Sequence, residues 1–155
     1  MSGRRGGIFG ALFCAALVAC TPPSGRGLNH AALDNAIAQA IGGPSTCLLL
    51  ADRASGKVVY RFGDEIACVR TLPQCDGPGL MNTGDALKLA DRPGGRLASC
   101  PDSPDGSRSV GWAAGRVQSA HNRDLTYSAV MEGQNALPGH IMASRLYDAF
   151  AAAGL

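Results

Sequence analysis

The sequence has few aromatic and charged residues, and it lacks several arrangements that would indicate a function. Aromatic residues make up 5% and charged residues 17% of its 155 residues. No basic stripe with interleaved aromatics is present, which argues against nucleic-acid binding. No Cys-x-x-Cys motif and no His/Cys cluster has the spacing of a zinc site, so we expect neither a metal nor a cofactor.

The first residues carry the pattern of a bacterial lipoprotein signal. Two arginines precede an apolar run over 8–18, and small residues lead into Cys20. The apolar run is too short to span a bilayer as a helix. We therefore expect a signal peptide over 1–19, lipid attachment at Cys20, and a tether rich in Pro, Gly and Ser over 20–27. The alternative is an ordinary secretory signal in which Cys20 is incidental.

Both interpretations predict an exported protein, and the lipoprotein signal predicts one anchored in the membrane and facing the periplasm. Residues 28–155 then form a single domain, because this length supports one hydrophobic core but not two. Loss of the two leader arginines reduces the 14 basic residues to 12, which equals the 12 acidic residues. The mature protein is thus expected to be nearly neutral, which indicates neither a strongly acidic nor a strongly basic partner.

Four cysteines lie in the mature chain: Cys47, Cys68, Cys75 and Cys100. In an oxidising compartment an even number of cysteines favours disulfides over metal binding. We expect Cys68 to pair with Cys75 across the short loop between them, which leaves Cys47 to pair with Cys100. The other two connectivities stay open, because a sequence does not supply the geometry that a disulfide requires.

Hydrophobic periodicity and turn residues predict an α+β domain. The expected helices cover 28–41 and 138–153, and the expected strands cover 46–52, 57–62, 96–100, 109–118 and 125–132. Only a short helix over 85–90 is expected in the irregular stretch 63–92. Because both long helices are amphipathic, we expect a five-stranded antiparallel sheet with the N- and C-terminal helices on one face, a sandwich of two layers.

Several of these segments together resemble a known family. They are the hairpin over 48–62 with Ser55-Gly56-Lys57, the strand Gly111-Trp112-Ala113-Ala114-Gly115-Arg116-Val117, and the closing helix that ends in Ala153-Gly154-Leu155. They resemble the α/β part of penicillin-recognising serine enzymes, the class D β-lactamases and the related transpeptidase domain. The resemblance implies that the helical subdomain of that family is missing, because the segment 63–95 is too short to contain it.

The resemblance also implies a degenerate active site. In the family, a Lys-Thr-Gly strand that lines the active site precedes the Gly-Trp-x-x-Gly-x-Val strand, and here Arg96-Leu97-Ala98 takes its place. Arg96 keeps a cation that can hold a carboxylate. Leu97 lacks the hydroxyl of the family's threonine, and Ala98 lacks the glycine that allows a substrate backbone to approach closely.

The nucleophile of the family is missing. Its enzymes acylate a serine three residues before a lysine, so that both side chains share one helix face. The only lysines here are Lys57 and Lys88, and Ala54 and Asp85 stand three residues before them. A Ser-x-Val sequence occurs at Ser128, but it follows the Trp112 strand instead of preceding it. We therefore expect no catalytic residue.

The other polar and aromatic side chains are expected to have structural roles. Ser99 is expected to be an ordinary strand serine, Cys75 half of a disulfide, and Trp112 a core aromatic. Asp76 and Asp85 form no acid/base pair of a glycosidase. The three histidines, His30, His121 and His140, are scattered and expected at the surface.

Three functions follow from these observations. The first is an envelope lipoprotein, a catalytically inactive relative of the family that binds peptidoglycan peptide or an envelope protein. The second is a residual β-lactamase or transpeptidase, and the third is an unrelated disulfide-bonded exported domain. Loss of the helical subdomain would expose a sheet edge and apolar surface, so the first function also predicts homo-oligomerisation or a protein partner.

Overall fold

The protein is built around one antiparallel sheet. A computed structural model describes residues 27–118 and 124–155, so the signal peptide, Cys20, the tether as far as residue 26 and His121 lie outside the described residues. The strand order is β2-β1-β7-β6-β5, and every pair of neighbours is antiparallel. The strands are β1 (Thr46–Asp52), β2 (Val58–Phe62), β5 (Arg96–Pro101), β6 (Ser109–Arg116) and β7 (Leu125–Gly133).

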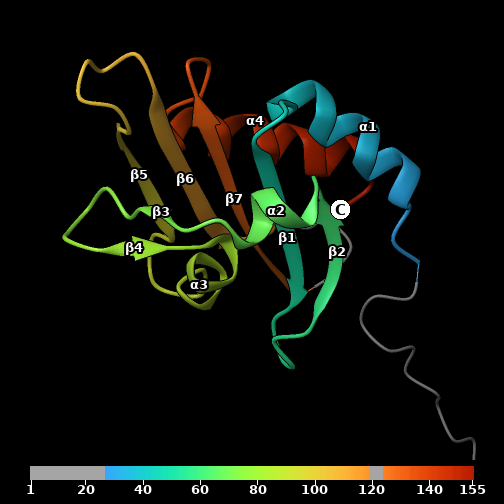
Figure 1. Cartoon of the computed structure of the whole chain (residues 1–155). Coiled ribbons are helices and arrows are strands. Elements are labelled where there is room, and N and C mark those ends of the chain that lie inside the picture. Colours follow the sequence, from blue (N-terminus) through green and yellow to red (C-terminus); the bar gives the residue numbers. More distant parts are fainter. Residues whose placement is uncertain (1–26, 119–123) are drawn as a thin grey trace, which may run out of the picture.

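Helices α1 (His30–Ile41) and α4 (Gly139–Ala152) lie against each other on one face of the sheet (Figure 1). The Asn29 side chain caps α1 by accepting a hydrogen bond from Ala32 N. Apolar side chains on a helical period, among them Leu33 and Leu146, are fully buried against the sheet. The expectation of an α+β domain with five antiparallel strands and these two helices on one face is confirmed.

The opposite face of the sheet is also covered, so the expectation of two layers is wrong. The cover consists of α2 (Glu65–Val69), α3 (Thr83–Lys88) and a small hairpin of β3 (Leu72–Pro73) and β4 (Leu80–Met81). All seven residues of β1 are buried, and Leu49 and Trp112 belong to a second apolar cluster beneath this cover. A strand buried on both faces requires a third layer.

The sequence does not predict this third layer, because its elements are short. A helix of five residues and strands of two residues are too short to show a hydrophobic periodicity. The short helix that the sequence predicts over 85–90 begins two residues earlier, because Asn82 and Asp85 form a capping box at its start.

The structure contains two disulfides, but their pairing differs from the expected one. Cys47 pairs with Cys68, and Cys75 pairs with Cys100, so Cys68–Cys75 and Cys47–Cys100 were wrong. Cys68 lies on α2, which packs against β1, whereas Cys75 lies beyond β3 and is bonded to Cys100 of the outer strand β5. Each bridge thus ties the short elements of the third layer to the sheet, as small exported domains in oxidising compartments often do.

Within the described ranges, no helix combines the length and the apolar character that crossing a membrane requires.

Candidate functional site

The strand that sequence analysis expects in the place of the Lys-Thr-Gly strand is β5, an outer strand of the sheet. The Arg96 side chain extends over the third layer, where Nη2 donates hydrogen bonds to the Gln74 carbonyl oxygen and the Asp76 carboxylate. It is only 9% exposed, and its Nε is buried without a hydrogen-bond partner in the described residues. Sequence analysis expects this cation to be available to a substrate carboxylate, but the guanidinium is instead paired with a carboxylate of the protein itself.

The other two residues of this motif have no polar side chain that could bind a ligand. The Leu97 side chain is 51% exposed, while Ala98 packs against the second apolar cluster. Gly139, which begins α4, lies directly against the Ala98 backbone, because a Cβ on Gly139 would come within 2.8 Å of Ala98 N. One face of this strand is thus closed by α4 at Ala98.

The short helix α3 carries the lysine nearest to this region, and the lysine is ion-paired. Lys88 Nζ lies 2.9 Å from Asp85 Oδ1, three residues earlier in the helix. The hydrogen bond from Lys88 lowers the pKa of the Asp85 carboxyl and so favours its carboxylate form. The Lys88 side chain is 76% exposed, and a solvated ammonium beside a carboxylate is not a neutral base that accepts a hydroxyl proton.

Two buried hydroxyl side chains lie at the start of α3, and both are inaccessible. Ser128 Oγ donates a hydrogen bond of 2.7 Å to the carbonyl oxygen of Thr83, the first residue of α3. Both residues are fully buried, and Thr83 Oγ1 has no hydrogen-bond partner in the described residues. Ser128 therefore links α3 to the central strand β7, and neither hydroxyl is open to a substrate.

The remaining candidates have structural contacts as well. Ser99 Oγ accepts a hydrogen bond from Gly139 N at 2.8 Å, and Cys75 is half of a disulfide. Trp112 is fully buried, and its Nε1 donates to the Pro73 carbonyl oxygen. His30 contacts the Tyr60 ring edge to face, and His140 is exposed on α4. Their expected structural roles are in agreement with these contacts.

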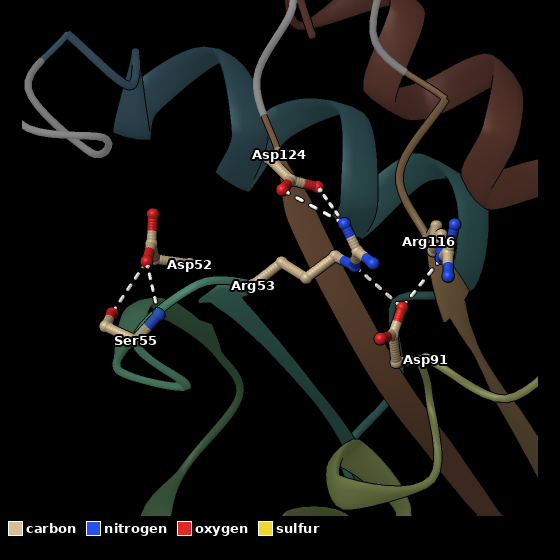
Figure 2. A network of polar contacts seen from close by, with 6 residues as sticks. All are labelled: Asp52, Arg53, Ser55, Asp91, Arg116 and Asp124. Carbon is tan, nitrogen blue, oxygen red and sulfur yellow. Dashed lines mark hydrogen bonds and ion pairs between the residues drawn. The ribbon is translucent and has the colours of Figure 1, made fainter.

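A polar network that sequence analysis missed closes one end of the sheet (Figure 2). Asp91 Oδ1 lies 2.7 Å from Nε of both Arg53 and Arg116, and Arg53 also pairs with Asp124 at 3.2 Å. The hydrogen bond from Arg53, followed by that from Arg116, lowers the pKa of the Asp91 carboxyl. These residues come from the ends of four different segments, so no sequence spacing indicates them. The network aligns the strand ends and the end of α3, and it contains no nucleophile.

In the described part of the chain, no three His, Cys, Asp or Glu side chains gather as a metal site would require. No family model, curated protein or solved structure matches the chain. The resemblance to penicillin-recognising enzymes therefore stays a prediction from the sequence.

Proposed function

We propose that this chain is an exported protein of the cell envelope that binds peptidoglycan peptide on a scaffold of the penicillin-recognising type and carries out no acyl transfer. In this proposal, lipid attachment at Cys20 anchors the domain to the membrane and the tether holds it in the periplasm. The two disulfides support an oxidising compartment.

One observation supports the loss of catalysis most strongly. Three side chains of β5, α3 and β7 that sequence analysis considered for this chemistry are each engaged within the protein: Arg96 pairs with Asp76, Lys88 pairs with Asp85, and Ser128 donates to Thr83. Covalent catalysis needs an accessible nucleophile beside a base that can take its proton. Binding needs neither of these groups.

The open edge of β5 supports a peptide as the ligand. No strand among the described residues pairs with the outer side of β5, so an extended peptide can add to the sheet there through main-chain hydrogen bonds. The exposed Leu97 side chain offers an apolar contact to one of its residues. This is the non-catalytic use of a sheet edge that the loss of the helical subdomain would leave uncovered.

The loss of acyl transfer is tested by intact-mass measurement of the purified, disulfide-bonded protein after incubation with a panel of penicillins and carbapenems. We expect no mass increase. A stoichiometric adduct that digestion maps to one serine or threonine would refute the proposal and identify a residual β-lactamase or transpeptidase.

Peptide binding is tested by fluorescence anisotropy with a labelled peptidoglycan stem peptide. We expect Leu97→Asp to weaken binding, because it places a charge beside the open edge of β5. The matched control is Val58→Asp on β2, at the opposite edge of the sheet, where the native side chain is similarly exposed. Equal effects of the two variants, or no binding by the parent protein, would refute β5 as the peptide site and favour another envelope partner.

A further inference from the structure

A hollow of about 630 Å³ lies at the start of β5, beside the turn that precedes this strand. Its volume is in the range of small-molecule sites, which is about 300–1,000 Å³. Apolar walls come from Pro93, Leu97 and Ala143, which belong to the turn, to β5 and to α4. The hollow is thus shaped by three separate parts of the chain.

A tyrosine that is mostly buried lines this hollow. Tyr127 is 8% exposed, and its ring packs edge to face against Phe150 at a centroid distance of 5.3 Å. Its hydroxyl forms no hydrogen bond with any other described residue and is not fully enclosed, so it is accessible to a ligand. Burial raises the pKa of the Tyr127 phenol, so the hydroxyl stays protonated at neutral pH and can donate.

The absence of a side chain at Gly115 leaves the tip of Tyr127 open to the hollow. A Cβ on Gly115 would lie 3.6 Å from Tyr127 Cε1 and 3.8 Å from its hydroxyl oxygen. Gly115 also lines the hollow. A larger side chain at this position would therefore occupy the space in front of the hydroxyl without a severe clash.

Among the described residues that line the hollow, the charged side chains are both arginines. Arg92 and Arg116 are among its described lining residues, and no aspartate or glutamate is. Asp91 holds Arg116 through Nε at 2.7 Å, which fixes the guanidinium at the rim. The Arg92 side chain is exposed and makes no ion pair with a described residue. An anion at this position would meet two cations and a hydroxyl donor.

We propose that this hollow, the Tyr127 pocket, binds a small organic anion that carries a carboxylate on an apolar body about the size of a phenyl ring. Arg92 and Arg116 attract the carboxylate, the Tyr127 hydroxyl donates a hydrogen bond to it, and the apolar body contacts Leu97 and Ala143. The pocket shares Leu97 with the proposed peptide site, but Arg92, Arg116 and Tyr127 do not belong to that site, so variants of these three residues test the pocket separately.

The test uses 4-fluorophenylacetate as the probe and follows its ¹⁹F NMR line width as the purified, disulfide-bonded protein is added. The neutral isostere 4-fluorophenylacetamide serves as the matched ligand. We expect the carboxylate to bind at least about tenfold more tightly than the amide, because each hydrogen bond that involves a charged group contributes more than a neutral one. Equal affinities, or no broadening by the parent protein, would overturn the proposal.

Variants then locate the binding site. Gly115→Val fills the space before the hydroxyl and is expected to abolish broadening, while Gly77→Val, whose Cβ would meet nothing within 4 Å, is expected to leave it unchanged. Near-ultraviolet circular dichroism checks that both variants are folded. Undiminished binding by a folded Gly115→Val protein would overturn the assignment.

Two milder variants keep the test decisive if Gly115→Val does not fold. Tyr127→Phe removes only the hydroxyl and is expected to weaken carboxylate binding by about tenfold. Arg92→Gln is expected to weaken it several-fold, whereas Arg61→Gln, an exposed arginine on β2 that does not line this pocket, should have no effect. Unchanged affinity in both Tyr127→Phe and Arg92→Gln would exclude the Tyr127 pocket as the binding site.

Discussion

Trp112 Nε1 donates a hydrogen bond to the carbonyl oxygen of Pro73, 2.7 Å away and 39 residues earlier in the chain. Trp112 is the only tryptophan, it is fully buried, and it lies on β6 beneath the third layer. Pro73 belongs to β3, which has only two residues. This bond therefore attaches the smallest hairpin of the protein to the centre of its sheet.

We expect Trp112→Phe to lower the free energy of unfolding by about 2 kcal/mol, because it leaves a small cavity and an unpaired Pro73 carbonyl. Urea unfolding followed by far-ultraviolet circular dichroism measures this loss. Tyr147→Phe, at an aromatic position that is 55% exposed, is the control and should change stability little. Equal stabilities of Trp112→Phe and the parent protein would contradict the buried contact.

The disulfide pairing makes a direct chemical prediction. Trypsin cleaves after Arg53, Arg70 and Arg96, and so separates the four cysteines onto four peptides. A digest without reduction should contain one linked pair that joins Cys47 to Cys68 and one that joins Cys75 to Cys100. Mass spectrometry identifies both, and any Cys68–Cys75 link would contradict the structure.

Removal of the Cys47–Cys68 bridge should be costly. Its cysteines are 21 residues apart, and closing a loop of this length in the unfolded chain corresponds to about 3 kcal/mol. The double variant Cys47→Ala, Cys68→Ala should lose about this much free energy of unfolding in urea while retaining the other bridge. A loss below about 1 kcal/mol would show that α2 is held to β1 mainly by packing.

The large elements could be predicted from the sequence because their patterns are long. Strand β1 was predicted with its observed bounds, and helix α1 differed only at its start, because a long apolar run marks the strand and helical spacing continues through the helix. The third layer could not be predicted, because α2, β3 and β4 take their shape from the sheet beneath them. The wrong disulfide pairing has the same origin, since Cys68 and Cys75 are near in sequence but lie over different strands.

For the candidate site, the sequence predicted only which motifs of the family are missing. The missing Ser-x-x-Lys is visible in the sequence, and so is the replacement of Lys-Thr-Gly by Arg96-Leu97-Ala98. The ion pair between Arg96 and Asp76 is not visible in the sequence, because the two residues are 20 positions apart and β4 and α3 lie between them. No sequence pattern indicates the Tyr127 pocket either, because it forms where a glycine on β6 lies beside a tyrosine on β7.

Glu132 should contribute stability that depends on pH. Burial alone would raise the pKa of its carboxyl, but hydrogen bonds from Arg70 and Arg108 outweigh burial and lower it. A carboxyl whose pKa is lower in the folded protein stabilises fully above its unfolded pKa of about 4.3, and this contribution is lost as pH falls through the folded pKa.

We expect Glu132→Gln to lower the free energy of unfolding by about 2 kcal/mol at pH 7 and to reduce the loss of stability between about pH 5 and pH 2. Urea unfolding at a series of pH values measures both effects. Asp148→Asn, which changes an exposed carboxyl on α4, is the control. A Glu132→Gln curve parallel to that of the parent protein would rule out this linkage.

Gly139 should tolerate no side chain, although its φ angle is not in the left-handed region. A Cβ at this position would lie 2.1 Å from the Trp112 carbonyl oxygen and 2.8 Å from Ala98 N. Both are backbone atoms of adjacent strands and cannot rotate away, so Gly139→Ala must displace the start of α4 from the sheet. We expect a loss of about 3 kcal/mol or more in the free energy of unfolding. Gly77→Ala, where a Cβ meets nothing within 4 Å, is the matched control, and equal stabilities of the two variants would show that α4 does not approach β5 and β6 this closely.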